Sequence, residues 1–243
     1  MKRLRHGAAL RRRALAAAPL LGLVLGAAPA HAAPLNPWGA PVGRGVVALT
    51  PFLFVDQQPL FSPLLYVQVG ATDRFEVLAG AGASLGRNSS SFDGVEFMPR
   101  LFFTDSTGLA LHLSWSPGSD PVTAPELHGA YDLGALQLTM NLGWGPSLGQ
   151  AGFQPGTVYA LVAPELTLAG STSVFLEIDP TWDLAAGAGP AGQRFSLELV
   201  PGLSTAIADT HYLCFGLGVP VAPDLHARDL YLGAWYSIAF GGA

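Results

Sequence analysis

The sequence contains little cysteine and little charge. Cys214 is the only cysteine among 243 residues, so no intramolecular disulfide can stabilise the fold. Charged residues make up 12% of the chain, and no lysine follows Lys2. The net charge of −5 argues against nucleic acid as a partner, and a hydrophobic content of 50% excludes a disordered chain. With 30 glycines and 20 prolines, the chain is also a poor candidate for a helical bundle.

The N-terminus has the three-part pattern of a secretory signal peptide. Six of the twelve basic residues lie in the first thirteen positions, an apolar stretch covers residues 14–28, and Ala30-His31-Ala32 offers a small-residue cleavage site. We expect residues 1–32 to be removed, residues 33–44 to form a periplasmic segment, and residues 45–243 to form one folded domain. Beyond residue 32, no apolar run free of glycine and proline is long enough for a transmembrane helix.

The remainder of the chain alternates between large apolar and small or polar residues, the period of a β-strand. Residues 109–115 and 136–144 show this alternation without interruption. Twelve such segments can be marked, at about 45–55, 60–70, 75–84, 93–103, 108–115, 123–133, 135–144, 157–168, 172–182, 193–203, 211–219 and 229–240. Many have about the ten residues that a tilted strand needs to cross a bilayer.

Soluble β-sandwiches alternate as well, so the connections between segments are informative. The connections near residues 105–107, 133–134 and 169–171 are short. Those at 85–92, 145–156, 183–192 and 220–228 are mostly longer. Short turns at one end and longer loops at the other are typical of outer-membrane barrels. The sequence therefore predicts an all-β fold, a single antiparallel up-and-down transmembrane β-barrel of about twelve strands, in the outer membrane of a Gram-negative bacterium.

Aromatic residues at the apolar positions of the alternation favour a transmembrane barrel over a soluble β-sandwich. They fall into two bands, with aliphatic residues between them, as expected for rings at the two bilayer–water interfaces. The band at the short-turn end contains Phe75, Phe103, Tyr131 and Phe240, and the band at the long-loop end contains Trp115, Trp144, Trp182 and Phe195.

The alternate positions of the same segments carry polar and charged residues. The lumen of a barrel tolerates such residues, but the dry core of a β-sandwich does not. The candidate lumen-lining residues are Glu76, Glu96, Arg100, His112, Glu126, Glu165, Glu177, Asp179 and Glu198. They are interpreted either as an internally paired polar network or as a pore wall that favours cations and neutral solutes. Glu177 and Glu198 are expected at similar heights on neighbouring strands, which would make this pair sensitive to ions.

Prolines and glycines interrupt the pattern. Seven prolines lie inside the marked segments on the apolar parity: Pro51, Pro63, Pro99, Pro125, Pro164, Pro180 and Pro201. Because proline lacks the N–H that a sheet needs, these strands should be bulged or their limits should differ. Several glycines share the lumen parity, among them Gly80, Gly143 and Gly218, and are expected to leave room inside or to let the strands twist.

His112 and Ser114 are the only pair that suggests catalysis. They share one strand face, and a base beside a hydroxyl is the first requirement of nucleophilic catalysis. The pair resembles the His-x-Ser motif of outer-membrane lipid A deacylases, which implies Glu96 or Glu126 as an orienting carboxylate. We interpret both residues as polar lumen residues and expect no enzyme, no cofactor and no metal. Cys214 is expected to be a small packed residue.

The chain also resembles the MetA-like outer-membrane proteins of phenol-degradation clusters. The resemblance is carried by Asn36-Pro37-Trp38-Gly39, by the strand closing on Phe52-Leu53-Phe54-Val55-Asp56, and by glutamates close to in-strand prolines, as in Glu96-Phe97-Met98-Pro99. It implies uptake of small compounds, aromatic ones among them.

These observations predict a passive outer-membrane channel or transporter for small solutes, aromatic or hydrophobic compounds included. The alternatives are a lipid hydrolase that uses His112 and Ser114, and a plugged structural barrel. The expected partners are outer-membrane lipid, a small-molecule solute and the insertion machinery, which would recognise a C-terminal strand ending near Phe240.

Overall fold

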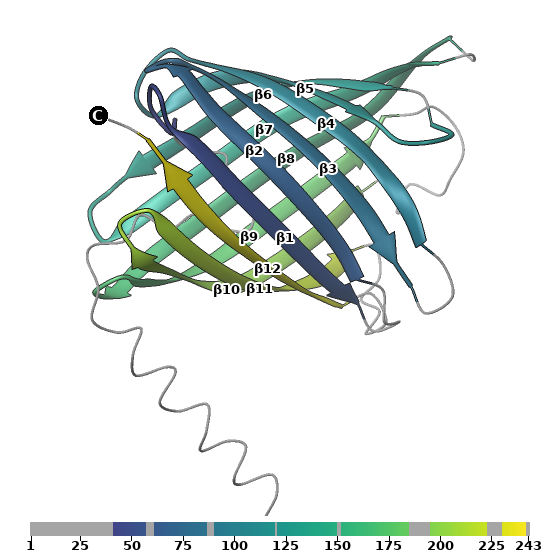
Figure 1. Cartoon of the computed structure of the whole chain (residues 1–243). Helices are drawn as coiled ribbons and strands as arrows, with labels where there is room; N and C mark the ends of the chain where they lie inside the picture. Colours follow the sequence, from purple (N-terminus) through teal and green to yellow (C-terminus); the bar gives the residue numbers. More distant parts are fainter. Residues whose placement is uncertain are drawn as a thin grey trace, which may run out of the picture.

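A computed structural model describes residues 41–56, 61–86, 90–119, 121–149, 152–184, 195–222 and 230–241. They form twelve β-strands (Figure 1). The strands are β1 (Val47–Asp56), β2 (Phe61–Thr72), β3 (Phe75–Leu85), β4 (Ser90–Phe102), β5 (Thr107–Trp115), β6 (Val122–Asp132), β7 (Leu136–Gly149), β8 (Gly152–Ala169), β9 (Thr172–Asp183), β10 (Phe195–Ala208), β11 (His211–Ala222) and β12 (Tyr231–Phe240). The predicted signal peptide and most of the predicted 33–44 segment lie outside the described residues.

The twelve strands close into a single antiparallel up-and-down barrel. Each strand pairs with its neighbours in sequence, and β1 pairs with β12 from Val47↔Phe240 to Asp56↔Tyr231. Closure leaves no strand edge with unpaired backbone groups. The predicted fold class is confirmed, and the β-sandwich is excluded. In the described part of the chain, no helix is long and apolar enough to cross a membrane.

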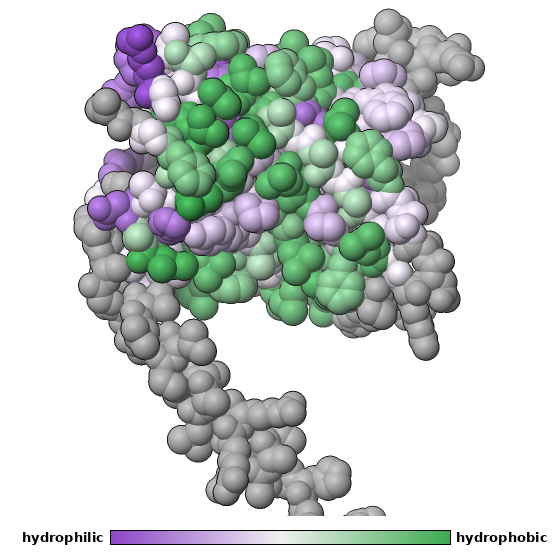
Figure 2. Space-filling view, in the orientation of Figure 1, coloured by the Kyte–Doolittle hydropathy of each residue, from purple (hydrophilic) through white to green (hydrophobic). Residues whose placement is uncertain are grey.

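The wall has an apolar outer face and a mostly buried inner face. In β5, Leu109 and Leu111 on the outer face are 45% and 40% exposed, whereas Ala110 between them is 5% exposed. Hydrophobic side chains dominate the face seen in Figure 2, and hydrophilic ones gather mainly at its upper left. The alternation predicted from the sequence is therefore confirmed.

The two ends of the barrel differ. Connections of two to four residues join β2–β3, β4–β5, β6–β7, β8–β9 and β10–β11 at one end, called here the turn end. The other end, called the loop end, has the longest connections, between β9 and β10 and between β11 and β12. The predicted long connection at 145–156 is wrong, because β7 and β8 continue as a hairpin and pair as far as Gly149↔Gly152. This arm breaks the period-two pattern because a register shift follows Gly145.

None of the seven prolines marked in the sequence ends its strand or shifts the register, whereas Pro146, which also lies within β7, coincides with the register shift between β7 and β8. Each of the seven keeps its pairing with one neighbouring strand, as in Pro63↔Leu53 and Val77↔Pro99. With the other neighbour, the pairing is interrupted at the proline and resumes in the same register: β2 and β3 pair at Phe61↔Leu85 and again at Leu64↔Gly82. The expectation of bulges at these seven prolines is therefore wrong, whereas the limits of some of their strands, such as β8 and β10, do differ from those marked in the sequence.

The reason is the geometry of an antiparallel ladder. The N–H and C=O of one residue both point to the same neighbouring strand, so a missing N–H weakens the pairing on one side only. The line of pairing between two neighbouring strands is called here a seam. The seams interrupted at prolines are β12–β1, β2–β3, β4–β5, β6–β7, β8–β9 and β10–β11. The alternate seams, within the hairpins that close at the loop end, continue past these prolines. The barrel thus consists of six hairpins joined by interrupted seams.

The inner face is less polar than the sequence pattern predicts. A cluster of buried side chains occupies it, comprising Phe52, Tyr66, Leu78, Met98, Ala110, Phe175, Val200, Cys214 and Trp235. Side chains fill much of the interior of a small barrel, and packing them requires apolar volume. Cys214 is fully buried in this cluster, as expected of a small packed residue.

Candidate functional site

All nine candidate lumen residues lie on the inner face of the wall. Glu76, Arg100, Glu126, Glu165 and Glu177 are buried, whereas Glu96, His112, Asp179 and Glu198 are half-buried. Eight of them form a paired cluster near the turn end and two acidic groups nearer the loop end, on β4–β6 and β9–β10. The ninth, Glu165 on β8, accepts a hydrogen bond from Oγ of Ser204 at 2.8 Å.

The paired cluster is built around one buried ion pair. Glu76 on β3 lies directly opposite Arg100 on β4, and Oε1 of Glu76 is 2.5 Å from Nη1 of Arg100. Nε2 of Gln68 donates to the same oxygen at 2.9 Å, and the backbone N–H of Val42 donates to Oε2 at 2.9 Å. Residues 41–44 therefore reach the inner face of the barrel at its turn end.

His128 and Phe102 complete this cluster. Nδ1 of His128 lies 3.3 Å from Nη2 of Arg100, and its ring meets Phe102 edge-on with centroids 4.8 Å apart. The Arg100 guanidinium lies over the Phe102 ring at 5.1 Å. All of these side chains are almost completely buried. This part of the lumen is therefore filled by a network that pairs its own charges. Glu76 and Arg100 were among the candidate lumen residues predicted from the sequence, whereas Gln68 and His128 were not.

The first acidic group joins Glu96, His112 and Glu126. Nε2 of His112 lies 3.3 Å from Oε2 of Glu96, without the alignment of a hydrogen bond. Tyr66 donates to Glu96 at 2.5 Å, and Tyr159 donates to Glu126 at 3.1 Å. Sequence reasoning missed both tyrosines, although each lies on the lumen parity of its strand.

The second acidic group contains Asp179 and Glu198. The register places these two residues directly opposite each other on β9 and β10, whereas Glu177 faces Val200. The like-charge pair expected between Glu177 and Glu198 is therefore an Asp179–Glu198 pair, with Glu177 two residues along the strand. Tyr231 on β12 donates a hydrogen bond to Glu198.

These three tyrosines follow one pattern, in which a ring crosses a glycine to reach a glutamate on the next strand. Tyr66 lies over Gly80, Tyr159 over Gly143, and Tyr231 over Gly218. A Cβ atom built on Gly143 would lie 2.1 Å from the Tyr159 ring, so no side chain fits there. The glycines expected to leave room in the lumen therefore seat aromatic rings, which hold the glutamates in place.

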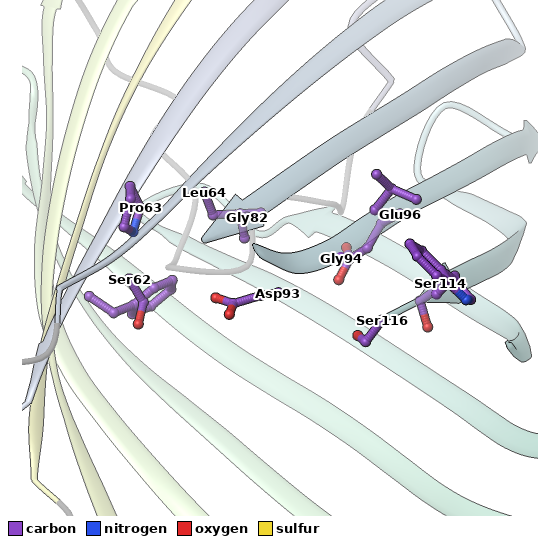
Figure 3. A pocket seen from close by; sticks show the side chains of 12 residues that line it. Ser62, Pro63, Leu64, Gly82, Asp93, Gly94, Glu96, Ser114 and Ser116 are labelled. Carbon is purple, nitrogen blue, oxygen red and sulfur yellow. The ribbon is translucent and has the colours of Figure 1, made fainter. Parts of the chain in front are cut away.

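His112 and Ser114 do not form a catalytic constellation. Both lie on the inner face of β5, and Glu96 contacts His112 as the lipid A deacylase resemblance implies. Among the described residues, however, no hydrogen bond joins Ser114 to His112. Ser114 instead lines a cavity of about 340 Å³ near the loop end, together with Glu96 and Ser116 (Figure 3).

The eight aromatic residues of the two bands point outward or lie half-buried on the wall. Seven are 36–50% exposed, and Phe195 is half-buried against Trp182, with ring centroids 5.2 Å apart. Phe75, Tyr131 and Phe240 lie at the turn end of their strands, Phe103 directly follows β4 at the same end, and Trp115, Trp182 and Phe195 lie at the loop end. Trp144 lies five residues inside β7, because that strand continues into the β7–β8 arm.

No three His, Cys, Asp or Glu side chains of the described ranges are arranged to hold a metal ion. The interior instead offers carboxylates, hydroxyl groups and one buried guanidinium. Such a lining can hydrogen-bond polar solutes and attract cations.

Comparison with known proteins finds similarity in structure only. No protein-family profile and no curated sequence matches the chain. The COG4313 outer membrane channel from Pseudomonas putida F1 superposes with a TM-score of 0.59 at 12% identity, covering 84% of this chain and 98% of that one. The KdgM porin (TM-score 0.56, 10% identity, 80% and 99% coverage) and the NanC porin (0.59, 8%, 81% and 100%) are also similar. The chain therefore has the barrel fold of Gram-negative outer-membrane proteins.

Proposed function

We propose that the chain is an outer-membrane channel for passive uptake of small solutes, with a preference for cations and neutral molecules over anions. The observation that carries this proposal is the inner face of the closed barrel, where seven carboxylic side chains accompany a single arginine among the nine candidate residues. Rings of acidic side chains select for cations in other pores. The apolar outer face, with its two aromatic bands, supports contact with lipid acyl chains and headgroups.

Reconstitution into a planar lipid bilayer tests this proposal directly. Discrete conductance steps with a K⁺-over-Cl⁻ preference are expected, and a protein that folds into the bilayer without conductance would instead be the plugged structural barrel. The packed cluster around Arg100 is the feature that favours this second possibility.

Neutralising the second acidic group is expected to weaken the preference for cations. The double variant Asp179→Asn/Glu198→Gln removes two facing carboxylates from the wall, so the K⁺/Cl⁻ permeability ratio should fall severalfold. Reversal potentials in a salt gradient measure this ratio. Asp105→Asn, at an exposed turn, is the matched control and should leave the ratio unchanged. An unchanged ratio in the double variant would place the permeation path elsewhere.

Ser114→Ala is expected to leave conductance and lipid composition unchanged, because no hydrogen bond activates the Ser114 hydroxyl in the described structure. Bilayer recordings and analysis of lipid A from cells carrying the protein measure the two properties. Release of acyl chains that disappears in this variant would establish the hydrolase instead.

The MetA-like resemblance adds small aromatic compounds to the proposed solutes. Their size is compatible with the cavity at the loop end, because about 150 Å³ is enough to hold benzene. We also propose that residues 1–32 direct export and that β12 is recognised by the outer-membrane insertion machinery.

A further inference from the structure

Two cavities lie on opposite sides of the same piece of wall. The inner cavity, of about 340 Å³, is lined by polar lumen residues such as Ser62, Glu96 and Ser114. The outer cavity, of about 410 Å³, is lined mainly by outward-facing apolar residues, including Leu65 and Phe92. Both cavities are lined by Pro63, Leu64 and Gly82, so these residues of β2 and β3 lie between them.

The wall between the cavities lacks backbone pairing. β2 and β3 pair at Phe61↔Leu85 and at Leu64↔Gly82, but not at the two positions between, where Pro63 has no N–H to donate. Across this gap the two strands are joined by side chains, with Oγ of Ser62 and Oγ of Ser84 3.4 Å apart. Separating the strands here therefore breaks fewer backbone hydrogen bonds than at an uninterrupted seam, and each of these bonds is costly to lose inside a membrane.

The Leu64 side chain lies beside this gap and lines both cavities. Leu64 is half-buried and lies beside Gly82 (Figure 3). A Cβ atom on Gly82 would approach Cδ1 of Leu64 to 3.2 Å, so the glycine provides the space in which Leu64 lies. On β3, Ala81 and Ala83 contribute only small side chains to the outer cavity. Joining the two cavities requires the Leu64 side chain to move aside and β2 and β3 to separate at the unpaired positions.

We propose that small, uncharged, apolar molecules leave the lumen sideways through this gap, called here the β2–β3 passage, and enter the interior of the membrane. The inner cavity opens on the lumen, and the apolar outer cavity faces acyl chains, so an apolar molecule gains a favourable environment by crossing the wall. Ions and strongly polar solutes do not take this path, because the outer cavity offers them almost no polar group. This inference rests on the proposed channel function and names one class of its solutes.

A disulfide across the gap tests the passage. In Ser62→Cys/Ser84→Cys, the two sulfurs replace facing hydroxyls and can join β2 to β3 when oxidised. Intact Gram-negative cells carrying the full chain are exposed to 1-N-phenylnaphthylamine, an apolar dye that fluoresces inside membranes. Oxidation is expected to slow the rise in fluorescence severalfold, and a reducing agent should restore it. The matched control is Thr172→Cys/Thr205→Cys, which replaces two facing hydroxyl groups 3.3 Å apart on the uninterrupted β9–β10 seam and should leave dye uptake unchanged.

The ionic conductance of the same variants separates this inference from the proposed function. Unchanged conductance together with slowed dye uptake supports the β2–β3 passage. Dye uptake that ignores the disulfide, in a protein that still conducts, overturns the passage and leaves the channel intact. Absence of conductance in the unmodified chain overturns the channel itself. Leu64→Ala provides a second test, because removing this side chain from beside the gap should accelerate dye uptake, and an unchanged or slower rate would contradict the passage.

Discussion

Replacing Arg100 with methionine is expected to lower the free energy of unfolding by about 3–5 kcal/mol, because the substitution leaves the Glu76 carboxylate buried without its cation. Gln68 and Val42 still donate to this carboxylate, but neither carries the positive charge that offsets its desolvation. Urea titration of the protein folded in lipid vesicles, followed by tryptophan fluorescence, measures the loss.

The double variant Glu76→Gln/Arg100→Met serves as the control. It removes both charges and keeps the volume similar, so most of the lost stability should return. A single variant as stable as the unmodified protein would show that water reaches Glu76. If the double variant is as unstable as the single one, packing rather than charge is the cause of the destabilisation.

Gly143→Ala is expected to destabilise the barrel by about 1–3 kcal/mol, because the added methyl group overlaps the Tyr159 ring. To make room, the ring must move away from the glycine, and its hydrogen bond to Glu126 is then lost. The same urea titration measures the stability, and single-channel recording should show a changed conductance because Glu126 is no longer held.

Gly145→Ala is the matched control for this prediction. Gly145 lies on the same strand two residues away, and a Cβ atom there would have no neighbour closer than 3.6 Å. Alanine at this position should therefore be tolerated. An equal loss in the free energy of unfolding in the two variants would mean that β7 needs the flexibility of glycine, not space for the Tyr159 ring.

The strands could be predicted from the sequence because each face of the wall has one environment. Every second residue of a strand such as β5 faces the same medium, so the alternation is a local property of the chain. The ends of the strands are less local, and β7 and β8 extend beyond the predicted limits because they pair with each other, not because their residues alternate. The prolines were misjudged for the same reason, since their effect depends on which neighbour the missing N–H would face.

The candidate site could be predicted only as a set of residues on one face. The alternation along each strand assigns Glu76, Arg100 and Glu198 to the interior. Their partners, however, depend on the pairing register between strands, which the sequence does not define. The tyrosine–glycine–glutamate arrangement joins three strands, as in Tyr66, Gly80 and Glu96, so no single segment contains it. The apolar cluster around Trp235 was missed because inward-facing apolar residues obscure the alternation that identifies the strands.

The proline-interrupted seams also have a consequence for how such a wall can change in evolution. Within each hairpin the backbone pairing of the two strands continues past the prolines, whereas the pairing between neighbouring hairpins is interrupted at them. Duplicating or deleting one hairpin would leave every remaining internal ladder intact and would require adjustment only at the interrupted seams. The circumference of the barrel could then grow or shrink in steps of two strands, which matches the even strand numbers of bacterial outer-membrane barrels.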